Sequence, residues 1–122
     1  MQRADFESLS SREQRKVAER EYKAMSALIF AECWEQGNIS DNYGALSEIH
    51  HAWERSHAPL WYKFQRENMF PISQWLHYTI HFKAPSDMTP KEREYYDHFQ
   101  EVKDRLKEEN DNYNQGLTED FT

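Results

Sequence analysis

The sequence has little of several residue types, and each shortage excludes a class of protein. A single cysteine, Cys33, excludes an internal disulfide and a multi-cysteine zinc site. Three glycines and four prolines are too few for a turn-rich β-sandwich, and 15% aromatic residues are too many for a disordered chain. No apolar run approaches the roughly 20 residues of a membrane-spanning helix. The 122 residues therefore predict a single domain over 1–122, cytoplasmic and without a membrane partner.

Charge is distributed unevenly along the chain. The formal net charge is −7, from 15 basic and 22 acidic side chains. Residues 1–83 contain ten Lys and Arg against eleven Asp and Glu, whereas residues 84–122 contain five against eleven. Affinity for nucleic acid comes from cations that displace the counterions of phosphate, which an acidic chain offers only at a local basic face. We therefore predict an acidic C-terminal surface and expect no direct nucleic-acid binding.

Helical periodicity and capping signals predict an all-α fold, a single-domain bundle of four to five helices. Ser10 and Glu13 form a capping box, and Gly37 suits the end of a helix because glycine adopts the left-handed conformation without penalty. Thr89 and Glu92 form a second capping box around a proline at the first helical position. The predicted helices span 11–36, 43–56, 59–68, 72–82 and 90–112, with a loose N-terminus over 1–9 and a mobile acidic tail over 113–122.

Residues 72–83 fit two kinds of secondary structure. Ile72, Leu76 and Ile80 recur every fourth residue, which is typical of a helix face. Residues 76–82 also alternate between apolar and polar side chains, which is typical of a strand. We expect a helix because the chain offers no second strand to pair with. The alternative is a strand that pairs across a dimer.

Five carboxylates of the predicted last helix follow one another at steps of four, three, four and three residues. This spacing places them on one face of a helix, which we call the acidic face. The acidic face can be a solvated surface, a contact for the basic residues of the first helix, or an imitation of a phosphate strand that a nucleic-acid-binding protein recognises. Its members are Asp97, Glu101, Asp104, Glu108 and Asp111.

Eighteen aromatic residues (four Trp, seven Tyr and seven Phe) exceed what so small a core can bury. Tryptophan and tyrosine dominate binding hot spots because they bury a large area at a low entropy cost. With the acidic face, they predict a non-catalytic module that binds another protein, as a small acidic inhibitor or adaptor of viral or mobile-element type. A homodimer is a further possible assembly, and no cofactor is expected. The predicted contact residues are Asp97, Glu101, Asp104, Glu108, Trp61 and Tyr96.

Histidine spacing gives an alternative function, in which the chain binds a metal. Glu54 and His57 form a Glu-x-x-His unit of the kind found in helical di-iron carboxylate sites, and His50 lies one turn before Glu54. His77 and His81 are also one helical turn apart, and this pair resembles motifs of the hemerythrin family of di-iron bundles. The resemblance implies a di-iron-like site, and zinc is the other candidate metal. The alternative ligand set is His50, Glu54, His57, His77 and His81.

Two further considerations bear on chemistry. In a strand, His77 and His81 would lie about 13 Å apart and could not bind one ion, so the metal hypothesis requires a helix there. The histidines can also simply fill amphipathic faces.

No glycine-rich phosphate loop or nucleophile elbow is present, and Cys33 fits a small core residue better than a nucleophile. An enzyme is therefore the less favoured class.

Overall fold

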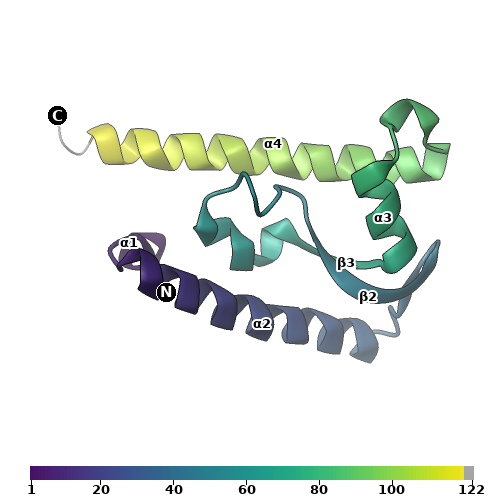
Figure 1. The fold of residues 1–122 in the computed structure, drawn as a ribbon, viewed down its shortest axis with the longest axis horizontal. Helices are drawn as coiled ribbons and strands as arrows, with labels where there is room; N and C mark the ends of the chain where they lie inside the picture. The colour runs from purple at the N-terminus through teal and green to yellow at the C-terminus, as the bar shows by residue number, and fades with distance from the viewer. Residues whose placement is uncertain (120–122) are drawn as a thin grey trace.

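The computed structural model describes residues 1–119 and places two long helices on opposite sides of a small sheet (Figure 1). Helix α2 spans Ser11–Glu35 and helix α4 spans Pro90–Glu119. Near one end of α4, the shorter helix α3 (Gln74–Phe82) lies between that helix and the sheet (Figure 1). The remaining elements are α1 (Arg3–Glu7), β1 (Ser40–Asp41), β2 (Gly44–His51), the 3-10 helices η1 (Leu60–Phe64), η2 (Arg66–Asn68) and η3 (Pro85–Asp87), and β3 (Met69–Ser73).

The fold is a mixture of helix and sheet, so the all-α prediction is wrong. Strand β2 occupies most of the predicted helix 43–56 and pairs antiparallel with both neighbours, in the order β1-β2-β3. Ile49 lies opposite Pro71 and His50 lies opposite Phe70. Strand β3 contains Pro71 and lies between and partly within the predicted helices 59–68 and 72–82, so the sequence prediction did not include it. Proline is tolerated in a strand at the edge of a sheet, which is where β3 lies.

Asp41 explains why the chain makes a hairpin where its sequence resembles a helix start. One of its carboxylate oxygens accepts hydrogen bonds from the backbone N–H groups of Tyr43 (2.7 Å) and Gly44 (3.1 Å), which forms a tight turn between β1 and β2. The other oxygen accepts from the N–H of Ser73 at the end of β3 (2.7 Å). Gly44 has a φ of 155°, a conformation that favours glycine. A capping-type residue thus joins three strands.

Several other boundaries differ from the predictions. Residues 59–68 form the short 3-10 helices η1 and η2 in place of one α-helix. Residues 1–9 contain helix α1, whose Phe6 is buried. Helix α4 continues past 112 to Glu119, so residues 113–119 of the predicted tail are helical, and residues 120–122 lie outside the described part of the chain.

Three predicted helices are confirmed, and a side-chain cap marks the start of each. The Ser10 hydroxyl accepts from the N–H of Glu13 (3.2 Å) at the start of α2. At the start of α4, the Thr89 hydroxyl accepts from the N–H of Glu92 (3.2 Å), while the Glu92 carboxylate accepts from the N–H of Thr89 (2.8 Å). The ambiguous segment 72–83 contains helix α3. Across residues 1–119, no helix has both the length and the apolar character needed to cross a membrane.

The main core holds α3 and α4 against the sheet. Phe99, Val102 and Leu106 form the buried stripe of α4. They share one cluster with Leu76 of α3 and Ile72 of β3. Because Leu76 turns toward this core, the rotational position of α3 about its own axis is fixed. That position decides which α3 side chains face β2.

Two polar anchors hold the irregular segment between β2 and β3. Asn68 is fully buried, and its side chain accepts from the N–H of Trp53 (2.7 Å) and donates to the carbonyls of Trp53 and Tyr62 (3.1 Å each). Arg3 of α1 donates to the Tyr62 hydroxyl (3.1 Å) and to the Asn110 side chain on α4 (2.6 Å). The Arg3 guanidinium also lies 4.0 Å from the ring centre of Tyr113.

Candidate metal centre

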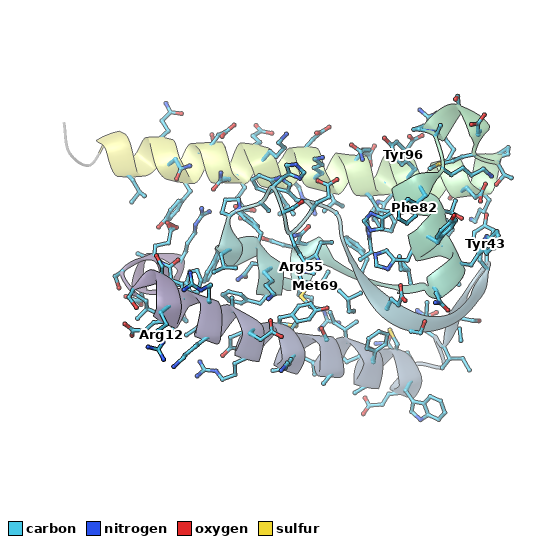
Figure 2. The ribbon with its side chains drawn as sticks, in the orientation of Figure 1. Arg12, Tyr43, Arg55, Met69, Phe82 and Tyr96 are labelled. Atoms are coloured by element: carbon cyan, nitrogen blue, oxygen red, sulfur yellow. The ribbon has the colours of Figure 1, made fainter. Side chains whose placement is uncertain are left out.

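Three histidines converge where α3 packs against β2. His50 comes from β2, and His77 and His81 lie one turn apart on α3. One ring nitrogen of each lies within 4.8 Å of the others, the only such group of three potential ligands among the described residues. We call these three residues the histidine cluster. Figure 2 labels Phe82 on α3 and Tyr96 on α4, which mark the end of the molecule where the cluster lies.

The pleat of β2 explains why His50 enters the cluster and its neighbour does not. Successive side chains of a strand point to opposite faces of the sheet. The ring of His50 lies 4.6 Å from the ring of Phe99 on α4, measured between centres. The ring of His51 stacks on Tyr22 of α2 at 5.6 Å, and its Nε2 lies 2.8 Å from the carbonyl of Lys63. His50 and His51 therefore face opposite sides of the molecule.

Local structure places the two histidines of α3. The Ser73 hydroxyl accepts from the N–H of Leu76 (3.2 Å) and caps the first turn of the helix. Side chains four residues apart on a helix lie on the same face, so His77 and His81 point in the same direction. Their ring centres are 4.6 Å apart, and they lie 5.5 Å and 5.4 Å from the ring centre of His50.

Two members of the histidine cluster, His50 and His81, have lowered pKa values that favour the neutral form that metals bind. His50 is 4% exposed, and its Nδ1 is buried without a hydrogen-bond partner among the described residues. Burial lowers the pKa of His50 to about 3, and the neighbouring His77, His81 and His51 add to this shift by repelling its positive form. The pKa of His81 is lowered as well, mainly by partial burial and secondly by repulsion from His77. The nearby carboxylates of Glu54 and Glu48 act in the opposite direction but do not outweigh these two effects. Metal binding to neutral imidazole therefore needs no proton release from His50 at pH 7.

A carboxylate orients one member of the cluster. Nδ1 of His77 lies 2.5 Å from Oε2 of Glu48, which is two residues before His50 on β2. When this nitrogen donates to the carboxylate, the opposite ring nitrogen of His77 carries the lone pair that a metal needs. Hydrogen bonding of a ligating histidine to a carboxylate fixes the ring and raises its basicity, and it is the usual second contact of such ligands.

The three nitrogens are close to the spacing that a metal requires. Zinc binds histidine nitrogens at roughly 2.0–2.1 Å in tetrahedral geometry, which places the nitrogens about 3.3 Å from one another. The cluster must therefore contract from at most 4.8 Å, a movement that rotation of the two partly exposed rings on α3 can supply. Three histidines occupy three of four tetrahedral positions and leave one for water or another ligand.

Two hollows open beside the cluster, and His81 and Glu54 line both. The larger, about 400 Å³, also reaches His51 and His77, whereas the smaller, about 290 Å³, also reaches His50. The Glu54 carboxylate lies 3.1 Å from Nζ of Lys103 on α4. Burial acts to raise the pKa of Glu54, but the hydrogen bond from its own backbone and the ammonium of Lys103 outweigh it, so the pKa is lowered. The carboxylate is therefore charged at neutral pH.

The structure brings together three of the five predicted metal ligands and leaves the other two outside the cluster. His50, His77 and His81 lie together, whereas Glu54 borders the hollows and stands outside the group of convergent ligand atoms. The side chain of His57 is 75% exposed, and its Nδ1 lies 3.9 Å from the Glu54 carboxylate. Glu48 is a residue of the candidate site that the spacing argument missed. It shares the His50 side of β2, which only a strand interpretation of 44–51 would have indicated.

The acidic face lies on a continuous helix, and all five of its carboxylates are in exposed residues of α4. Asp97 pairs with Arg93 one turn away (2.8 Å), and among the ion pairs of residues 1–119 none joins α2 to α4. Trp61 is half-buried against Phe6, with ring centres 5.6 Å apart. Tyr96 is half-buried and lines the smaller hollow. Partner binding through these residues stays a prediction.

Comparison of the chain with models of known protein families, with curated proteins and with solved structures found no match.

Proposed function

We propose that the protein binds a divalent transition metal ion, with zinc as the best candidate, through His50, His77 and His81. The observation that carries this proposal is the convergence of three ring nitrogens from two separate elements within 4.8 Å. Imidazole is a preferred ligand of zinc, copper, iron and nickel. The tetrahedral arrangement that three histidines and one open position can form is typical of zinc.

A purely structural role accounts poorly for the histidine cluster. A buried polar atom without a hydrogen-bond partner costs about 1–3 kcal/mol, and Nδ1 of His50 is such an atom. Protonation does not offset this cost, because burial and the neighbouring imidazoles disfavour the charged form. Glu48 adds a carboxylate contact of the kind that supports metal-binding histidines. A metal ion would offset the cost of bringing the three rings together.

Zinc titration of tag-free protein tests the proposal. Protein purified without chelator is analysed for its metal content, then stripped and titrated with zinc in competition with a chromophoric chelator. We expect one zinc per chain, with the affinity lowered at least about 100-fold in His77→Ala and His81→Ala, since each loses one of three ligands. Both residues are partly exposed, so these variants should remain folded.

The other histidines provide matched controls. His57→Ala and His98→Ala each remove one exposed imidazole outside the cluster and should bind zinc as the parent does. Equal zinc affinity in the parent, His77→Ala and His81→Ala would refute the site. Partner binding through the acidic face and a cytoplasmic location are separate proposals that depend on composition and spacing alone.

A further inference from the structure

The open side of the proposed metal centre faces a space that a small molecule can enter. His81 and Glu54 both border the hollow of about 290 Å³, and so do Tyr96 and Lys103 of α4. His50 also borders this hollow, so a metal held by His50 and His81 would lie beside it. The hollow is therefore bordered by proposed metal ligands, by one carboxylate and by two side chains that can donate hydrogen bonds.

Glu54 borders the same hollow as the proposed ligands His50 and His81, so it is the candidate base for a metal-bound water. Its carboxylate is not among the ligand atoms that converge within 4.8 Å, so it is set back from the metal position. Lys103 holds the carboxylate from the α4 side through contacts of 3.1 Å and 3.3 Å. A set-back carboxylate that shares a hollow with the ligands can accept a proton from water on the metal without itself becoming a ligand.

We propose that the metal centre hydrolyses small carboxylic esters, with Glu54 as the base that deprotonates a metal-bound water; this inference rests on the proposed metal site. A metal held by the three histidines would lower the pKa of its bound water; the water proton would move to a Glu54 oxygen while the water oxygen forms a bond to the carbonyl carbon of the ester. The electron pair of the carbonyl moves onto its oxygen. When the tetrahedral intermediate collapses, the bond to the alcohol oxygen breaks, and Glu54 returns the proton to the leaving alcohol. The products are a carboxylic acid and an alcohol, and only water is consumed.

The remaining groups of the hollow suit the charges of this reaction. The oxygen of the intermediate becomes negative, and donors already fixed around such an oxygen stabilise it more than mobile water does. The Lys103 ammonium can serve as one donor, because its contact with Glu54 leaves further N–H groups for a second acceptor. The Tyr96 hydroxyl is the other candidate on the same wall. The small volume of the hollow favours short acyl groups.

Hydrolysis of 4-nitrophenyl acetate by zinc-loaded protein tests this inference. The parent, Glu54→Gln and the control Glu35→Gln are compared, with the zinc affinity of each measured on the same preparation. Glu35 is exposed on α2 and lies outside both hollows. We expect zinc to accelerate hydrolysis by the parent and by Glu35→Gln. Glu54→Gln should keep the zinc affinity of the parent within a few-fold and lose about 100-fold in zinc-dependent rate, the range that general bases contribute.

Each outcome has a separate meaning. A parent protein that binds zinc but hydrolyses the ester no faster than its zinc-free form would overturn the hydrolytic proposal and leave the metal site standing. A Glu54→Gln variant as fast as the parent would overturn the role of Glu54 and with it the proposal. Failure of the parent to bind zinc would overturn the proposed function itself.

Discussion

Replacement of His50 should remove a defined part of the acid sensitivity of the metal-free protein. Burial and neighbouring histidines lower the pKa of His50 to about 3, whereas an unfolded histidine has a pKa of about 6.5. Between these two values the unfolded chain binds a proton at this residue and the folded protein does not. Protonation therefore favours unfolding as the pH falls from about 6.5 toward 3, and the full contribution to stability is present above 6.5.

The magnitude follows from the two pKa values. Each unit of difference corresponds to about 1.4 kcal/mol, so the whole window amounts to about 5 kcal/mol in the free energy of unfolding. Between pH 7 and pH 5 the expected loss is about 2 kcal/mol, because an unfolded histidine titrates through most of that range. His51 and His81 have lowered pKa values as well and shift the total in the same direction.

The measurement compares how much unfolding free energy the parent and the variant each lose between pH 7 and pH 5. Urea unfolding of the parent and of His50→Gln is followed by tryptophan fluorescence at pH 7 and pH 5, with chelator present throughout. Glutamine is polar and cannot be protonated, so the variant should lose about 2 kcal/mol less than the parent between the two pH values. The control His57→Gln changes an exposed imidazole and should keep the pH dependence of the parent. The same pH dependence in the parent and His50→Gln would refute the reasoning.

Two further substitutions test other contacts. Glu48→Gln weakens the contact with Nδ1 of His77, so the zinc affinity should fall about 10–100-fold while the control Glu35→Gln changes nothing; an unchanged affinity would show that Glu48 does not support the site. Asn68→Ala removes three buried hydrogen bonds and leaves the N–H of Trp53 without its partner, so the free energy of unfolding should fall by about 3 kcal/mol in urea at pH 7. A loss below about 1 kcal/mol would contradict the anchoring role of Asn68.

Local signals made the long helices predictable from sequence. The caps at Ser10 and Thr89 depend on residues only three positions away, so the pattern and the structure agree there. Strand β2 depends on pairing with residues 69–73, and no local pattern records such a partner. In the stretch after Asp41, the apolar residues recur at helical intervals. Asp41 itself resembles a helix cap until its hydrogen bonds from the turn, from the start of β2 and from the end of β3 are known.

The same limit applies to the candidate site. The pairing of His77 with His81 is local to one helix and followed from the spacing. A helix over 43–56 would have placed His50, Glu54 and His57 on one face, but β2 ends at His51 and the chain then turns away. His57 consequently remains in solvent, and His50 joins the cluster through contact between β2 and α3. The pattern indicated the ligand types, and the arrangement required the tertiary fold.

The contact between Arg3 and Asn110 implies an order of folding events. The two residues are 107 positions apart in the chain, so nearly the whole polypeptide must be arranged before their side chains meet. Closure of so long a loop carries an entropic cost that earlier contacts have to offset. Pairing of β2 with β3 involves far shorter separations and should precede it. The contact between Arg3 of α1 and Asn110 of α4 is therefore expected to be among the last native contacts to form. Its presence would indicate that the rest of the fold is already in place.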